Sequence, residues 1–329
     1  MAAVDPAALA ESVLAGNRRA VARAITLVES MRSDRREPAR ELLRGIAHAT
    51  GGAVRVGVSG VPGAGKSTFI DALGRRLIAA GHRVGVVAVD PSSARTGGSI
   101  LGDRTRMGEL AALDEAFVRP SPSGDHLGGV ARATRESMLV LEAAGYDVIV
   151  VETVGVGQSE VAVAGMVDTF LLLGLARSGD QLQGIKRGIL EMADVVAINK
   201  ADGEHAPEAR VAARDLRQAL HLMRPQDTPK VLTCSALTGE GLDEVWETVT
   251  SHRQELVEAG RLEARRAEQQ REWLWSMVDA ELRAAARTTP TVAQHRGDWE
   301  AAVSRGDLDA TEAAEKVLQA LRSDWRDTP

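Results

Sequence analysis

The nine residues GVPGAGKST, at positions 60–68, carry the strongest fold signal in the sequence. It satisfies the pattern G-x-x-x-x-G-K-[ST] and directly follows an apolar run. Glycines let backbone N–H groups turn inward around phosphates, and a helix that begins near Lys66 points its positive end at the same anion. The pattern predicts a phosphate loop in which Lys66 is a catalytic cation and Ser67 holds magnesium. Its nucleotide-binding residues are Gly60, Val61, Pro62, Gly63, Ala64, Gly65, Lys66, Ser67 and Thr68.

Short runs rich in β-branched residues surround this loop, and helical patterns separate them. Strands that are buried on both faces and alternate with helices are typical of a parallel sheet. The sequence therefore predicts an α/β fold of the P-loop NTPase type, with a mainly parallel central sheet and helices on both faces. The predicted strands are 53–60, 83–90, 146–153, 167–173, 194–200 and 230–237.

The two ends of the chain are helical in pattern. Residues 1–50 carry apolar side chains at helical spacing, and two glycines end this segment. After residue 260 the strand pattern stops and a long helical pattern begins, polar at first and apolar later, with TTPT at 288–291 as a break. We expect an N-terminal helical extension (1–50), a nucleotide-binding domain (51–260) and a C-terminal helical extension (261–329).

The composition limits the function further. The chain has 329 residues, a net charge of −6 and one cysteine, so we expect no broad nucleic-acid surface and no disulfide within the chain. The N-terminus lacks a signal-peptide pattern, and no apolar run reaches the roughly 20 residues of a spanning helix. We expect a cytoplasmic protein that does not bind a membrane.

The motif NKAD, residues 199–202, predicts the base. Its pattern N-K-x-D resembles the guanine-reading motif of GTPases, and it ends a predicted strand. The Asp202 carboxylate can accept the N1–H and N2–H₂ donors of guanine, Asn199 can brace the loop, and Lys200 can cover the ring. The sequence SAL resembles the loop whose backbone contacts guanine O6, although it also suits a helix N-cap. GTP is therefore favoured over ATP, with further contacts from Ser235, Ala236 and Leu237.

Segment 90–107, DPSSARTGGSILGDRTRM, has the composition of a loop and carries two aspartates and several arginines. Hydrolysis of a phosphate bond depends on positioning and on electrostatic stabilisation of the transferred group. We assign Asp103 to magnesium and Asp90 to the attacking water, and Arg104 is a candidate to offset developing charge. A solvated loop with charges for solubility is the alternative.

The stretch ETVGVGQSE, residues 152–160, places a carboxylate at the end of a buried strand. Many GTPases carry D-x-x-G at this point, and here the form is E-T-V-G. A buried carboxylate without a cation or donors is costly, so we assign Glu152 to magnesium and Gly155 to the γ-phosphate. An exposed Glu at the sheet edge is the alternative. Gln158 and Glu160 receive no role.

These residues together resemble the MeaB/ArgK-type GTPases. The resemblance runs from the N-terminal helices to about residue 260, and its most specific parts are VETVGVGQSE and GDQLQGIKRGILEMADVVAINKAD. It implies a slow GTPase that acts as a chaperone of the adenosylcobalamin-dependent methylmalonyl-CoA mutase. Such a chaperone gates cofactor loading and protects the mutase from inactivation. The ligands implied are GTP, GDP and Mg²⁺.

Two further expectations concern the later part of the chain. Segment 174–192 follows a strand and could report the nucleotide state to a partner, with Lys186 as a second phosphate-sensing, catalytic cation. An ordinary loop and surface helix is an equal alternative. The C-terminal extension is similar to the dimerisation extension of the family and contains four of the five tryptophans, so we expect a homodimer.

Two other functions compete with the chaperone role. A metal-insertion GTPase needs clustered thiolate or imidazole ligands, whereas this chain has only Cys234 and scattered histidines. Ligands paired across a dimer axis keep that alternative open. A small-molecule kinase of the ArgK type needs an acceptor pocket and has no reason to prefer guanine, so NKAD disfavours it.

Overall fold

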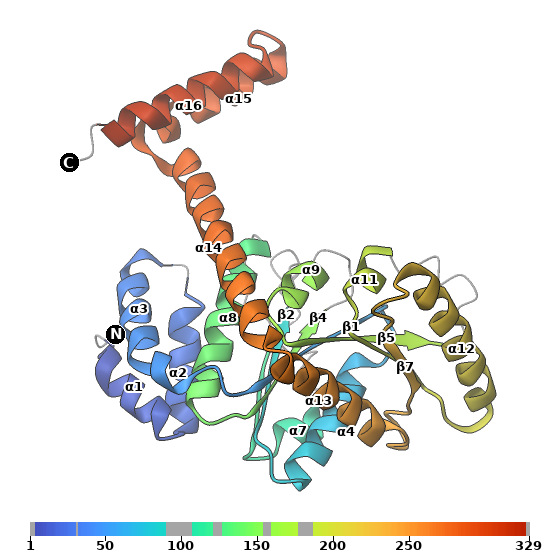
Figure 1. Cartoon of the computed structure of the whole chain (residues 1–329). Helices are drawn as coiled ribbons and strands as arrows, with labels where there is room; N and C mark the ends of the chain where they lie inside the picture. Colours follow the sequence, from blue (N-terminus) through green and yellow to red (C-terminus); the bar gives the residue numbers. More distant parts are fainter. Residues whose placement is uncertain are drawn as a thin grey trace. The chain divides into compact units, whose positions relative to one another are not determined.

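The computed structural model describes residues 4–30, 32–89, 107–120, 127–153, 159–176 and 187–326. Its centre is a seven-stranded sheet in which every pairing is parallel (Figure 1). The order β3-β2-β4-β1-β5-β6-β7 places β1 in the middle. The strands are β1 (Val54–Gly60), β2 (Val84–Val89), β3 (Ala116–Arg119), β4 (Val148–Thr153), β5 (Thr169–Leu175), β6 (Val195–Asn199) and β7 (Lys230–Thr233).

The structure confirms the predicted α/β fold and adds one strand. The strand β3 was not predicted, because only four residues form it at the edge of the sheet beside β2. The sequence predicted a strand over residues 230–237, but β7 ends at Thr233. Cys234 and the SAL sequence therefore lie beyond the strand.

Alternate side chains of each strand enter two separate cores. On β4, Val148 and Val150 belong to one core, whereas Ile149 and Val151 belong to the other. Both sets are buried because helices cover both faces, which explains the continuous apolar runs in the sequence. The first face packs on α4 (Lys66–Ala79), α7 (Gly108–Ala111) and α13 (Leu242–Glu258). The second packs on α8 (Leu127–Ala143), α9 (Ser159–Ala164), α11 (Arg187–Met192) and α12 (Ala206–Met223).

Three N-terminal helices pack against α8. Side-chain caps start two of them, because Asp5 and Asn17 accept hydrogen bonds from the first free backbone N–H groups. Their apolar faces join the core of the second sheet face. The helices are α1 (Pro6–Leu14), α2 (Arg18–Val28) and α3 (Ser33–Ile46), and short 3₁₀ helices lie at Ala47–Ala49 and Gly203–His205.

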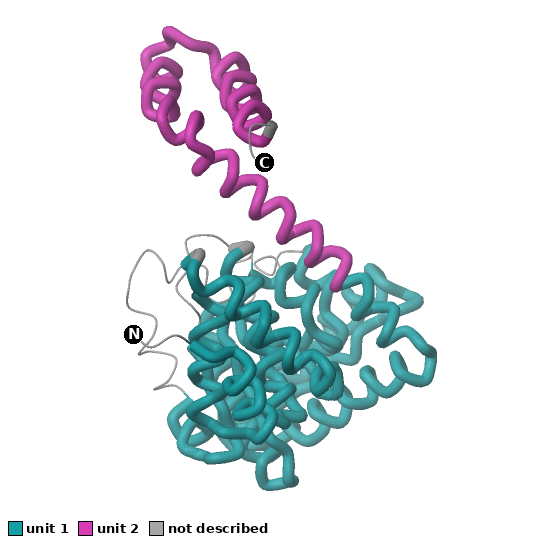
Figure 2. The backbone as a smooth tube through the Cα atoms, turned by 90° about the vertical axis from the view of Figure 1, so that its left-hand side faces the viewer, with its two compact units in different colours: residues 1–269 teal, residues 270–329 magenta. Residues whose placement is uncertain are grey.

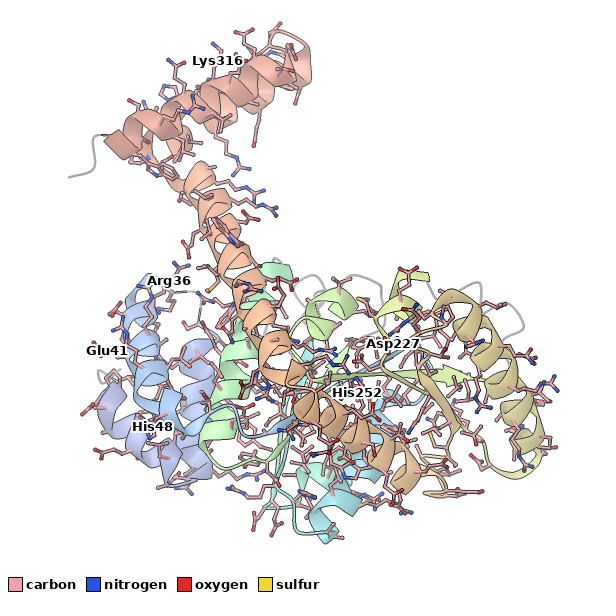
Figure 3. The ribbon with its side chains drawn as sticks, in the orientation of Figure 1. Arg36, Glu41, His48, Asp227, His252 and Lys316 are labelled. Atoms are coloured by element: carbon pink, nitrogen blue, oxygen red, sulfur yellow. The ribbon has the colours of Figure 1, made fainter. Side chains whose placement is uncertain are left out.

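Glu136 on α8 is a largely buried carboxyl group beside the arginines of α3. Arg132 lies 3.8 Å away along the same helix, and Arg36 of α3, labelled in Figure 3, and Arg40 also favour its charged form. Burial outweighs these charges and raises the pKa of Glu136 to about 7. The folded chain therefore holds a proton that the unfolded chain releases above its ordinary pKa, so stability falls as pH rises from about 4.5 to about 7.

The substitution Glu136→Gln removes this titration. We expect it to raise the free energy of unfolding at pH 8 by an amount on the order of 2 kcal/mol, and the gain to shrink toward pH 4.5. Urea denaturation at several pH values measures the difference. Glu41→Gln, at an exposed position on α3, is the control and should change little. Equal stability of Glu136→Gln and the unchanged chain at pH 8 would contradict the expectation.

The chain forms two compact units, Met1–Gln269 and Gln270–Pro329 (Figure 2). The helix α14 (Arg261–Thr288) belongs to both, because the boundary falls within it. The second unit also contains the paired helices α15 (Pro290–Arg305) and α16 (Ala310–Arg326). Across the residues that the structure describes, none of the helices has the length and apolar character that crossing a membrane requires.

Candidate functional site: a nucleotide site at the end of the central strand

The phosphate loop follows the central strand β1 and leads into α4. At Gly60 a Cβ atom would lie 2.3 Å from the carbonyl oxygen of Leu173 on β5, so no other residue fits there without moving backbone. Gly65 has φ +83°, and a Cβ there would lie 2.9 Å from the amide nitrogen of Asn199. These glycines therefore allow the turn of the phosphate loop. They also allow the close approach of Leu173 on β5 and Asn199 on β6 to the loop.

Lys66 is the first residue of α4, and its side chain is buried. The ammonium group donates hydrogen bonds to the carbonyl oxygens of Gly60 at 2.8 Å and Val61 at 3.4 Å. It therefore lies inside the loop that the glycines form. The unsatisfied N–H groups at the start of α4 add positive potential at the same place, so the loop suits an anion such as a phosphate.

Ser67 and Glu152 meet directly. The Ser67 hydroxyl donates a hydrogen bond of 2.9 Å to Oε1 of Glu152, which is buried at the carboxyl end of β4. Next to Glu152, the Thr153 hydroxyl donates to Ser59 Oγ at 2.9 Å, which ties the ends of β4 and β1 together. A hydroxyl and a carboxylate are hard oxygen donors of the kind Mg²⁺ prefers, so the pair fits that ion.

Asn199, at the end of β6, connects the phosphate loop with the SAL sequence. Its side-chain amide donates to the Ala64 carbonyl at 2.8 Å and accepts from the Ala236 backbone N–H at 3.0 Å. The next residue, Lys200, has φ +61°, which is strained for a residue with a side chain. Its Cε atom lies 3.8 Å from the point where a Cβ on Gly65 would be, so the lysine stem passes over the phosphate loop.

Asp202 and Ser235 are joined at the far side of this loop. The Ser235 hydroxyl donates to Asp202 Oδ1 at 2.6 Å and accepts from the Thr238 backbone N–H at 3.2 Å. The carboxylate is thus held in one orientation and is only partly buried. Leu237 is 81% exposed, next to the buried Ala236. The structure therefore brings the predicted phosphate loop, NKAD and SAL residues to one edge of the sheet.

Cys234 is buried and contacts the side chain of Asn199. Its sulfur is 3.8 Å from Asn199 Oδ1, and burial raises the pKa of the thiol to about 12. The group is therefore a neutral thiol at physiological pH and packs in the core, where it supports the amide of Asn199. The sequence alone did not reveal this contact, because neither residue type nor spacing indicates which strand end a buried cysteine faces.

Several predicted site residues lie outside the described residues. They are Asp90, Asp103, Arg104, Gly155, Gln158 and Lys186. Glu160 is described and is buried at the start of α9, where the Ser159 hydroxyl is 3.5 Å from its Oε2 atom. No pattern in the sequence indicates that this carboxylate is buried.

Comparisons with known proteins show the family to which the chain belongs. The family model described as Methylmalonyl Co-A mutase-associated GTPase MeaB matches residues 21–291. The chain belongs to the MeaB family. It is therefore a P-loop GTPase, as the motifs predicted.

Relatives and a solved structure extend the match over nearly the whole chain. A probable GTPase of Mycobacterium tuberculosis is 57% identical over 314 residues, 94% of each chain. The mitochondrial methylmalonic aciduria type A homolog of Mus musculus is 44% identical over 321 residues, 94% of this chain and 77% of the mouse protein. The crystal structure of a LAO/AO transport system kinase superposes with a TM-score of 0.75 at 36% identity, covering 98% of this chain and 100% of that one.

Proposed function

We propose that this MeaB-family GTPase is a chaperone of the adenosylcobalamin-dependent methylmalonyl-CoA mutase, which gates cofactor loading and protects the mutase from inactivation. The observation that carries the proposal is the family match over residues 21–291, since the family is named for its association with this mutase. The similarity to the mouse methylmalonic aciduria homolog supports it. The cytoplasmic location expected from the sequence stays a prediction.

In the proposed site, the phosphate loop holds the phosphates of GTP and Asp202 reads guanine. Two contacts support this reading: the ammonium of Lys66 lies inside the loop, and the hydroxyl of Ser235 orients the Asp202 carboxylate. A fixed acceptor discriminates between bases because the wrong base leaves buried polar groups unpaired. Ser67 and Glu152 would hold Mg²⁺, which neutralises phosphate charge when bound.

A pull-down tests the partner. The tagged chain, loaded with GDP or with a non-hydrolysable GTP analogue, is incubated with lysate, and the captured proteins are identified by mass spectrometry. We expect methylmalonyl-CoA mutase to be enriched in one nucleotide state over the other. Capture of no cobalamin-dependent enzyme in either state would count against the proposal.

We also propose that the C-terminal extension, residues 261–329, forms a homodimer. Large apolar side chains on the second compact unit are exposed, and tryptophans are enriched in protein interfaces. These exposed side chains are Leu274, Trp275, Leu282, Leu318 and Trp325. Light scattering should give a dimer mass for the whole chain and a monomer mass for a chain that ends at Gln270. A dimer that persists in the shortened chain would contradict this proposal.

A further inference from the structure

The turn between α9 and β5 is held by side chains from two other helices. Gln269, in the first third of α14, donates from its side-chain amide to the Val167 carbonyl at 2.8 Å. Arg135 of α8 donates to the Gly165 carbonyl through one nitrogen and to the Gln269 carbonyl at 3.2 Å through another. Gln269 and Val167 are both buried. We call these four residues the α9 clamp.

The residue after the clamped turn anchors α14 more strongly. The Asp168 carboxylate, whose side chain is fully buried, accepts from Nε and Nη2 of Arg266 at 2.8 and 2.7 Å. It also accepts from the backbone N–H of Arg55 on β1 at 3.1 Å. A two-fold arginine–carboxylate contact fixes geometry as well as charge, so the early part of α14 is tied to the start of β1.

A second anchor lies one strand further along the same edge. Arg265 of α14 donates to the Asp194 carboxylate at 3.0 Å. His252 of α13, labelled in Figure 3, lies 3.5 Å from the same carboxylate. The other ring nitrogen of His252 is 2.9 Å from the Thr169 hydroxyl. Arg265 and Arg266 fix the position of the first part of α14 against the sheet. The position of Gln269, on the same helix, is therefore fixed relative to the turn that follows α9.

The other end of α9 lies at the edge of the sheet that carries the nucleotide site, because the helix connects the carboxyl end of β4 with the start of the parallel strand β5. The helix begins at Ser159, six residues after Thr153 at the end of β4, and both Ser159 and Glu160 are buried. Val163 packs on β1: a Cβ atom on Gly57, three residues before the phosphate loop, would lie 2.8 Å from its Cγ1 atom. The helix α9 is a single short element, so a shift of its clamped end changes the placement of its other end.

We propose that Gln269 and Arg135 are positioning residues for GTP hydrolysis, which act by holding the α9–β5 turn. The contacts described above for Gln269 and Arg135 are with the α9–β5 turn and with each other, and none of them involves the phosphate loop or the NKAD and SAL residues. Their effect reaches the nucleotide through α9, whose first residues follow the carboxyl end of β4 where Glu152 contacts Ser67. The inference rests on the proposed placement of the phosphates at this end of the sheet, and it is independent of the mutase.

The geometry predicts a selective effect on rate. In the proposed site, the guanine base and the phosphates bind residues 60–68, 199–202 and 235–237, none of which belongs to the clamp. Positioning of the reacting groups tolerates much less displacement than binding does, because a misplacement of about 1 Å can cost about a hundredfold in rate. Loosening the clamp should therefore lower kcat and leave nucleotide affinity nearly unchanged.

The test compares Gln269→Met with Gln270→Met in the full chain. Methionine matches glutamine in length and helix propensity but donates no hydrogen bond. Gln270 is the exposed neighbour on the same helix, so its variant controls for the change of residue type. We expect the rate at saturating GTP to fall by about tenfold or more in Gln269→Met and to stay within about twofold in Gln270→Met, with GDP affinity within about twofold in both.

Hydrogen exchange and a variant of Arg135 provide two further tests of the clamp. Hydrogen exchange of peptides covering 159–164 should increase in Gln269→Met and not in Gln270→Met, and Arg135→Met, which removes the other donor of the clamp, should reproduce the loss of rate. A rate equal to that of the unchanged chain in Gln269→Met would overturn the inference. A parallel loss of GDP affinity would also overturn it, because it would show general disruption. All assays use the chain alone, so they are unaffected if the proposed mutase partnership fails.

Discussion

Replacing Lys66 with alanine is expected to lower the rate of GTP hydrolysis by about a thousandfold or more. The ammonium group lies within the phosphate loop, 2.8 Å from the Gly60 carbonyl, and its side chain is buried. At that depth a positive charge faces the phosphates with little screening by water, and electrostatic stabilisation is the main contribution that proteins make to phosphoryl transfer. Alanine keeps the helix start of α4 but removes the charge.

Release of phosphate from GTP, followed with purified variants, checks this expectation. Lys230→Ala is the matched control, because Lys230 is exposed at the start of β7, at the opposite end of the strand from the nucleotide site. The control should keep the full rate. A Lys66→Ala variant that folds and hydrolyses GTP at the rate of the control would remove Lys66 from the proposed site.

The second large effect is expected at Asp202. The substitution Asp202→Asn should weaken GTP binding by about a hundredfold to ten-thousandfold and should improve binding of XTP, which carries a carbonyl oxygen where guanine carries an amino group. The side-chain oxygen of asparagine can still accept a hydrogen bond from guanine N1–H. Its NH₂ group, however, faces the N2 amino group of guanine, and because both are donors no hydrogen bond forms between them. The same amide can donate to the carbonyl of xanthine. The Ser235 hydroxyl can still donate to the side-chain oxygen at position 202, so the loop should keep its structure.

Competition of GTP, XTP and ATP for a fluorescent GDP analogue measures this change of preference. Asp215→Asn, on the exposed surface of α12, makes the same chemical change away from the site and should leave the preference unaltered. Retention of the preference for GTP in Asp202→Asn would show that another group reads the base.

Much of the sheet and of the nucleotide site could be predicted because local patterns determine them. The glycines and Lys66 of the phosphate loop act through backbone geometry and charge that any strand–loop–helix context supplies. The apolar runs indicated six strands, since strands buried on both faces need such runs. The short edge strand β3 has too few residues for a pattern of this kind.

Long-range polar contacts could not be predicted. The start of α14 is almost entirely polar, which suggests a solvated helix, yet Gln269 is buried and Arg265 and Arg266 pair with carboxylates at the start of β5 and β6. The partner of a charged side chain depends on the tertiary arrangement, which residue type does not encode. The same reason applies to Cys234 behind Asn199, whose contact joins segments 35 residues apart.

The most direct test of the proposed chaperone role is the lifetime of the mutase during turnover. Methylmalonyl-CoA mutase loaded with adenosylcobalamin is assayed alone, with the chain and GTP, with the chain and GDP, and with Lys66→Ala and GTP. We expect the chain with GTP to prolong mutase activity and Lys66→Ala with GTP to have no such effect. Identical loss of mutase activity in all four mixtures would contradict the proposed role.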